Sequence, residues 1–168
     1  MKKYIILFFT LFVLSISSKA QSQISAKYHG EIDLGYSIGV GTFSTDRVNI
    51  HTVQGVMIGQ YFSAGLGLGL DYYHEIYDKG ELMIPIFLDI KGYIPVTDNL
   101  SPFVSFDLGY GIGATDGLKG CDGLLWSPAI GIRYKHFKFQ LGYASQRISE
   151  DGLGFDMNAV QFKIGAIF

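Results

Sequence analysis

The last eleven residues, 158–168, constrain the fold most strongly because their side chains alternate with a period of two. One face of an extended strand would be apolar and would carry Val160, Phe162, Ile164, Ala166 and Phe168. The other face would carry Gln161, Lys163 and Gly165. A tilted strand of about 9–11 residues is long enough to cross a bilayer. The segment therefore predicts a membrane-crossing strand with one apolar face.

The first twenty residues have the pattern of a cleaved signal peptide. Lys2 and Lys3 precede an apolar run over 4–16, and small residues flank Lys19 in Ser18-Lys19-Ala20. The alternative is a transmembrane anchor, which needs roughly 20 apolar residues and is disfavoured by the shorter run. We expect cleavage before Gln21 and a single mature domain over 21–168.

The charge and cysteine content of the remaining chain exclude several classes of protein. Only three of the 13 basic residues and none of the 15 acidic residues lie in 1–20, so the mature net charge would be −5. This acidic balance argues against a nucleic-acid partner. Cys121 is the only cysteine, so the chain has neither an internal disulfide nor a cysteine-rich zinc site.

The composition favours a closed barrel. The chain is 48% hydrophobic with 22 glycines, yet no apolar run after residue 20 is long enough for a spanning helix. A bilayer admits only helices or closed barrels, because every backbone N–H and C=O must be paired within the protein. Exported apolar chains without spanning helices are therefore expected to form barrels.

Seven further alternating segments join the C-terminal one, at 27–40, 47–61, 64–75, 82–94, 101–113, 125–134 and 137–148. In the second, Gln54 and Gln60 share a face with Val56 and Ile58, so we expect a bulge there. Eight is the smallest of the even strand numbers found in bacterial barrels. The sequence predicts an all-β, eight-stranded antiparallel up-and-down transmembrane barrel. Its longer connections, 41–46, 76–81, 114–124 and 149–157, would be the external loops.

Several segments carry a family resemblance: GLGLGLDYY (65–73), PIFLDIKGYIP (85–95), SPFVSFDLGYGIG (101–113), SPAIGIRYK (127–135) and FQLGYASQR (139–147). They resemble the strands of small OmpA/OmpX-type outer-membrane proteins. The resemblance implies a bacterial outer-membrane location, contact with lipopolysaccharide and other outer-membrane lipid, and a monomeric state. It also implies insertion by the barrel-assembly machinery, with Phe162, Ile164 and Phe168 as the C-terminal assembly signal. The alternative is a soluble, lipocalin-like barrel, which would have its apolar face inside.

The inward face of such a barrel would hold a set of charged side chains. The candidate ion-pair network is Glu31, Asp33, Asp71, Asp89, Lys91, Asp107, Arg133, Lys138 and Lys163. An eight-stranded barrel is just wide enough for side chains to fill it. Charges enclosed there must be paired, because an isolated buried charge is very unfavourable. We expect a structural plug; the alternative is a gated proton or ion path.

Catalytic chemistry has little support in the sequence. Four histidines are spread over different segments, and no HExxH is present. Lipid A deacylases with this fold share a His-x-Ser-Asn element, whereas this chain has Tyr143-Ala144-Ser145-Gln146 near its final strands. We therefore expect a non-enzymatic protein with an envelope-structural or surface-interaction role, without a cofactor or metal. The alternatives are a lipid A deacylase-like or acyltransferase-like enzyme and a narrow pore.

Overall fold

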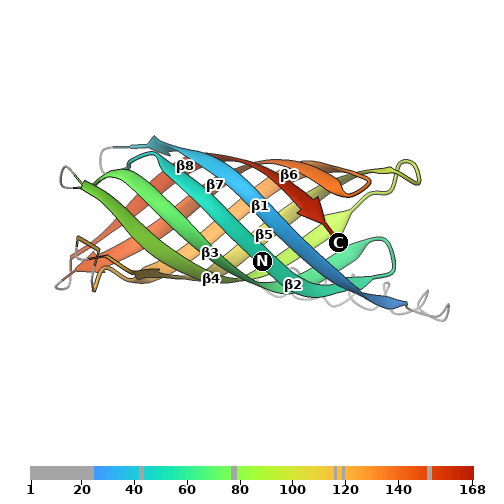
Figure 1. Cartoon of the computed structure of the whole chain (residues 1–168), viewed down its shortest axis with the longest axis horizontal. Coiled ribbons are helices and arrows are strands. Elements are labelled where there is room, and N and C mark those ends of the chain that lie inside the picture. The colour runs from blue at the N-terminus through green and yellow to red at the C-terminus, as the bar shows by residue number, and fades with distance from the viewer. Residues whose placement is uncertain (1–24, 42–43, 77–78, 116, 119, 151–152) are drawn as a thin grey trace, which may run out of the picture.

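The computed structural model describes residues 25–41, 44–76, 79–115, 117–118, 120–150 and 153–168. The expected signal peptide, 1–20, lies outside these residues. Within them, eight strands form one closed antiparallel barrel in chain order. They are β1 (Ala26–Val40), β2 (Arg47–Ile58), β3 (Phe62–Ile76), β4 (Lys79–Tyr93), β5 (Leu100–Gly113), β6 (Gly123–Tyr134), β7 (Phe137–Glu150) and β8 (Leu153–Ile167). The predicted fold class is confirmed (Figure 1).

The barrel closes where β8 pairs with β1, from Glu31 opposite Ile167 to Val40 opposite Asn158. The C-terminal alternation that stands out in the sequence is therefore the closing seam of the barrel. No helix long and apolar enough to span a membrane occurs in the described part of the chain.

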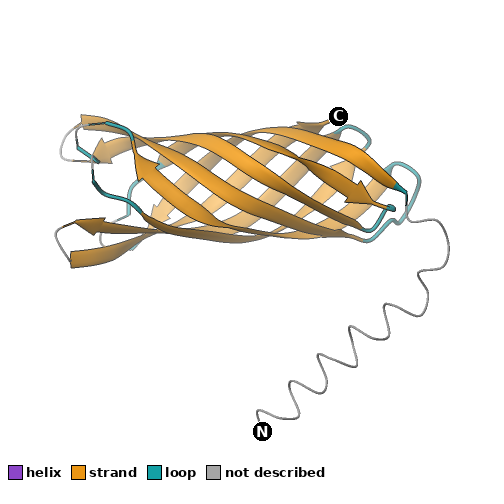
Figure 2. Ribbon diagram, turned by 90° about the horizontal axis from the view of Figure 1, so that it is seen from below, coloured by secondary structure: helices purple, strands orange, loops and turns teal. Residues whose placement is uncertain are grey.

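The two ends of the barrel differ. One end, called here the turn end, holds the connections 59–61, 94–99 and 135–136 together with the C-terminus (Figures 1 and 2). At the opposite end, the loop end, β1, β3, β5 and β7 finish and β2, β4, β6 and β8 begin. Two of the expected long loops, 76–81 and 149–157, are wrong. β3 ends at Ile76 and β4 begins at Lys79, and β7 ends at Glu150 and β8 begins at Leu153. Backbone pairing there extends beyond the apolar alternation, which is the signal that sequence reading follows.

The expected bulge in the second strand is also wrong. Residues 47–58 of β2 pair in unbroken register with both β1 and β3, and a register shift occurs instead between β3 and β4 near Tyr73 and Ile76. Gln54 lies on the outward face with its apolar neighbours. Its side-chain amide accepts a hydrogen bond from the Tyr28 hydroxyl and donates one of 2.8 Å to Thr52 Oγ1. These hydrogen bonds satisfy the Gln54 side-chain amide, so Gln54 can lie on the outward face of β2 without a shift in register.

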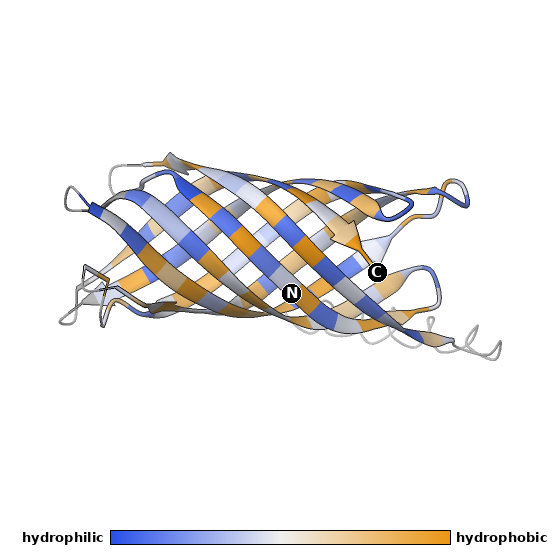
Figure 3. Ribbon diagram, in the orientation of Figure 1, coloured by the Kyte–Doolittle hydropathy of each residue, from blue (hydrophilic) through white to orange (hydrophobic). Residues whose placement is uncertain are grey.

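Apolar and polar residues alternate along the strands (Figure 3). The apolar positions are largely exposed on the outside and the polar positions largely buried inside. On the outside, Leu66 is 68% exposed, Ile130 62% and Phe139 59%. The inward positions of the same strands include aspartate, lysine, glutamine and serine side chains that are buried. A soluble ligand-binding barrel has the opposite arrangement, with its apolar face inside.

Glycines on the inner face make room for larger side chains, as Gly109 illustrates. Gly109 of β5 lies opposite Phe87 of β4. A Cβ at Gly109 would lie 2.1 Å from the Ile86 carbonyl oxygen and 2.5 Å from Phe87 Cα. Because these are backbone atoms, rotation of a side chain cannot relieve the overlap.

We predict that Gly109→Ala lowers the free energy of unfolding by about 1–3 kcal/mol, the usual effect of overpacking. Gly92→Ala is the matched control, because a Cβ there would have its nearest contact at an ordinary 3.7 Å, from Val104 Cγ2. Urea unfolding in detergent micelles, followed by tryptophan fluorescence, measures both. Equal stability of the two variants would contradict the close approach of β4 and β5 at Gly109.

Candidate functional site

The centre of the charged interior is Glu31 on β1. Its carboxylate pairs with Lys138 of β7, and its Oε2 lies 3.1 Å from Lys91 Nζ of β4. Its other oxygen, Oε1, lies 2.7 Å from His29 Nε2. Lys138 Nζ also lies 3.0 Å from Asp33 Oδ2. All five side chains are buried. The cluster joins β1, β4 and β7, no two of which are neighbours in the barrel wall.

Lys91 extends the network to a second group of charges. Its Nζ lies 2.5 Å from Asp89 Oδ2. Asp107 of β5 lies directly opposite Asp89 of β4 in the sheet. Lys163 Nζ of β8 lies 3.4 Å from Asp107 Oδ2. The two groups together place charges from β1, β4, β5, β7 and β8 in one connected interior.

A third group surrounds Asp71 on β3, nearer the loop end. Its Oδ1 accepts a hydrogen bond of 2.7 Å from Asn49 Nδ2 and lies 2.7 Å from His51 Nε2. Arg47 Nε lies 3.9 Å from Asp71 Oδ2. Arg47 also donates a 3.0 Å hydrogen bond to the Tyr73 hydroxyl. Asp71 is thus held by three residues of β2.

Residues of β2 and a histidine of β1 are the site residues that sequence analysis missed. Arg47, Asn49 and His51 occupy alternate positions of β2 and therefore share the inner face. The alternation is present in the sequence, but Gln54 and Gln60 on the apolar face obscure the phase of this strand and so hide which residues face inward. His29 was absent from the candidate network although it lies two positions from Glu31 on the same face.

Arg133 is the one candidate that the structure places outside the ion-pair network. It is half-buried at the turn end, and its Nε donates a 3.2 Å hydrogen bond to the Lys135 carbonyl oxygen. Within the described residues, no carboxylate lies within 4.0 Å of its guanidinium. Lys138 lies directly opposite Arg133 in the sheet and turns inward to Glu31 and Asp33. The Arg133 guanidinium instead lies over the buried Tyr93 ring, with its central carbon 5.9 Å from the ring centre.

Carboxylates outnumber permanent cations in the described interior of the barrel. The described part of the lumen holds six carboxylates, Glu31, Asp33, Asp71, Glu81, Asp89 and Asp107, against the four permanent cations Arg47, Lys91, Lys138 and Lys163. His29 and His51 each contact one of these carboxylates. Because an isolated buried charge is very unfavourable, the burial of these carboxylates depends on their contacts with the lysine, arginine and histidine side chains.

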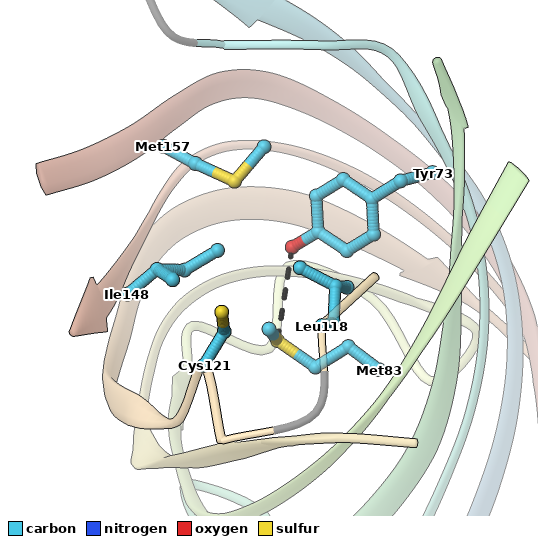
Figure 4. Packing of buried hydrophobic residues seen from close by; sticks show 6 residues of the cluster. All are labelled: Tyr73, Met83, Leu118, Cys121, Ile148 and Met157. Atoms are coloured by element: carbon cyan, nitrogen blue, oxygen red, sulfur yellow. Dashed lines mark hydrogen bonds between the residues drawn. The ribbon is translucent and has the colours of Figure 1, made fainter. Parts of the chain in front are cut away.

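Apolar side chains separate and cap these charges. Val53, Phe87 and Leu125 form one buried cluster, and Met57, Tyr93 and Phe103 form another. A third cluster, of Tyr73, Met83, Leu118, Cys121, Ile148 and Met157, lies at the loop end (Figure 4). The sequence pattern assigned Phe87 to the inner face but gave no indication that the interior is layered.

The connection between β5 and β6 folds inward to complete the cap at the loop end. Leu118 and Cys121 from this connection are buried in the third cluster. Glu81, at the start of β4, accepts hydrogen bonds from the Thr115 hydroxyl and from the Gly117 backbone N–H at 3.2 Å. The Gly113 N–H donates a 3.1 Å hydrogen bond to Asp122 Oδ1. These bonds hold the connection against the barrel mouth.

The connection between β1 and β2 is fixed by Asp46. Its carboxylate accepts hydrogen bonds from the Gly39 backbone N–H at 2.9 Å and from the Tyr36 hydroxyl at 2.8 Å. These two bonds lower the pKa of Asp46 below its ordinary value. The carboxylate is therefore charged, and the connection held, at neutral pH.

Metal-binding and nucleophilic arrangements are absent from the described residues. No group of three histidine, cysteine, aspartate or glutamate side chains among them is placed to hold a metal ion. No histidine ring within the described ranges is hydrogen-bonded to a serine hydroxyl. His136 Nδ1, for example, lies 3.1 Å from the backbone carbonyl oxygen of Ile167.

No protein-family model matches the chain, and no curated protein matches its sequence. Several solved structures are similar in fold. The N-terminal β-barrel domain of Pseudomonas aeruginosa OprF shares 15% identity, with a TM-score of 0.52, over 86% of this chain and all of that one. Neisserial surface protein A shares 9% identity, with a TM-score of 0.65, over 85% of this chain and 97% of that one. The outer membrane enzyme PagL shares 8% identity, with a TM-score of 0.62, over 81% and 98%. At these identities the similarity shows the barrel fold alone.

We predict that Lys138→Met lowers the free energy of unfolding by roughly 3–5 kcal/mol, because it leaves Glu31 and Asp33 without a shared cation in the interior. Arg133→Met is the control and is expected to have little effect, since Arg133 lies outside the network. Urea titration in detergent micelles measures both variants. A Lys138→Met variant as stable as Arg133→Met and the wild type would show that Lys138 is not a member of a buried network.

Proposed function

We propose that the protein is an integral protein of the bacterial outer membrane, with a non-enzymatic role in envelope structure or surface interaction. The observation that carries this proposal is the exposed apolar belt around a barrel that closes on itself. A closed barrel pairs its backbone polar groups internally, which is the condition for entering a bilayer. The fold similarity to the OprF barrel domain and Neisserial surface protein A supports the same proposal.

Aromatic residues support the membrane-spanning orientation. Exposed aromatic side chains lie at the turn end, namely Tyr28, Phe62, Tyr134, Phe137 and Phe168. A second set lies towards the loop end, namely Tyr36, Tyr72, Tyr110 and Trp126. Transmembrane barrels have aromatic girdles at both interfaces and short periplasmic turns. We therefore assign the turn end to the periplasm and the loop end to the cell exterior.

The filled interior favours a structural role over transport. Ion pairs join opposite walls near Glu31, and apolar clusters lie on the path between the two ends. An eight-stranded barrel has little room beyond its own side chains. A filled interior is compatible with a role in envelope structure or surface interaction, which uses the outer surface and the external connections.

The alternative of an enzyme that acts on outer-membrane lipid has weaker support. PagL, named as an outer membrane enzyme, has a similar fold. In this chain, however, His29 and His51 are engaged with Glu31 and Asp71 inside the barrel. Neither is placed to activate a nucleophile on the lipid-facing surface.

We predict that the protein fractionates with the outer membrane and resists alkaline extraction, because its apolar belt requires a lipid environment. Boiled and unboiled samples should migrate differently on gels, as expected for a barrel that detergent alone does not unfold. The measurement is immunoblotting of separated inner-membrane, outer-membrane and periplasmic fractions. Recovery from the periplasm without detergent would contradict the proposed location.

We predict unchanged lipid A acylation when the protein is overproduced in a Gram-negative host, because its described histidines form no nucleophilic arrangement. Mass spectrometry of extracted lipid A provides the measurement, with an empty-vector strain as control. Loss or gain of an acyl chain would support the enzyme alternative.

A further inference from the structure

A polar cavity at the turn end contains two cations that the ion-pair network does not use. The cavity has a volume of about 460 Å³ and is lined by the 95–99 connection together with Gln60, Ser101, Arg133 and Lys135. Within the described part of the chain, neither Arg133 nor Lys135 has a carboxylate within 4.0 Å. The cavity therefore presents two cations and one carboxylate, Asp98, that are not ion-paired with each other.

Hydrogen bonds and ring contacts fix Arg133 and Lys135 at this end of the barrel, where the Lys135 Nζ lies 5.7 Å from the centre of the Tyr134 ring. Arg133 uses Nε for the Lys135 carbonyl oxygen, and its guanidinium carbon lies 5.9 Å from the centre of the Tyr93 ring. Its two terminal nitrogens have no hydrogen bond to any described residue. The backbone N–H of Lys135 donates a 2.8 Å hydrogen bond to the Asn99 carbonyl oxygen. A guanidinium with free terminal nitrogens is suited to bind phosphate oxygens.

Lys135 is an unusual residue for its backbone conformation. Its φ of 54° lies in the left-handed region, in the two-residue connection between β6 and β7. Glycine adopts this conformation with less strain than any residue that has a Cβ. The turn alone therefore gives no reason for a lysine here, whereas a cationic cavity does.

An apolar groove begins beside the polar cavity on the outer face of the barrel. The groove has a volume of about 650 Å³ and is lined by side chains of β5, β6, β7 and β8. Ile94, Pro102 and Ile132 line the groove, and their chain neighbours Pro95, Ser101 and Arg133 line the cavity. The two hollows thus lie next to each other at the turn end, where lipid acyl chains give way to headgroups in the proposed orientation.

We propose that this composite site binds one anionic phospholipid of the periplasmic leaflet. The phosphodiester contacts Arg133 and Lys135, and one acyl chain lies in the groove past Ile132. Asp98 also lines the cavity, so two cations and one carboxylate leave a single net positive charge. That charge complements the single negative charge of a phosphatidylglycerol headgroup. The inference rests on the proposed membrane location and on the periplasmic assignment of the turn end.

Native mass spectrometry of the full barrel, released from mixed phosphatidylglycerol and phosphatidylcholine nanodiscs, tests the site. The wild type should retain one phosphatidylglycerol. The double variant Arg133→Gln, Lys135→Gln should retain about tenfold less, the loss expected for charge-assisted hydrogen bonds. Asp98→Asn should increase retention, because it removes the negative charge from the cavity.

Lys27→Gln is the matched control, since Lys27 is an exposed lysine at the same end of the barrel and does not line the cavity. It should retain lipid as the wild type does. Equal retention by the wild type and the double variant, both scored as heat-modifiable folded protein, would overturn the site. Displacement of the lipid by millimolar glycerol 3-phosphate would also overturn it, because it would indicate a site for a soluble phosphate.

The outcomes distinguish this inference from the proposed function. A protein that inserts into the outer membrane but retains no anionic lipid selectively leaves the proposed function intact and removes the site. A protein found outside the membrane removes both.

Discussion

The pairing of β8 with β1 is the constraint on which the rest of the structure depends. It closes the sheet, so the wall has no unpaired strand edge. Closure also divides the side chains into two sets, because neighbouring residues of a strand point to opposite faces. Only after closure can one set form a continuous apolar belt while the other is enclosed and must satisfy its own charges. The outer surface and the ion-pair network are thus two consequences of one seam.

The interior charges are better explained by specificity than by stability. Buried ion pairs gain little over apolar packing once their desolvation is counted, although breaking one is strongly unfavourable. A slip of one residue in strand register would move Glu31, Lys91 or Lys138 onto the outer face. In the observed register the contacts of Glu31 join β1 to β4 and β7. We infer that these contacts disfavour alternative registers, which apolar packing alone would not distinguish as strongly.

The sequence predicts the wall of the barrel better than its interior. Alternation places the strands and inward residues such as Glu31 and Asp107 correctly, because a period of two is a local property. It misses the extensions of β3, β4, β7 and β8, whose pairing continues beyond the apolar belt. It assigns Arg133 to the inner face but cannot reveal that Lys138 takes the nearby carboxylates. The cap formed by Leu118 and Cys121 depends on contacts with distant strands and has no local signal.

The central claim is that the barrel is a closed wall around a filled, charge-paired interior. Planar-bilayer recording with folded, heat-modifiable protein tests this claim most directly. The account predicts no steady open-channel current across the bilayer, because the ion pairs around Glu31 and the apolar clusters fill the path between the two ends. A reproducible ohmic current from the same folded material would contradict it.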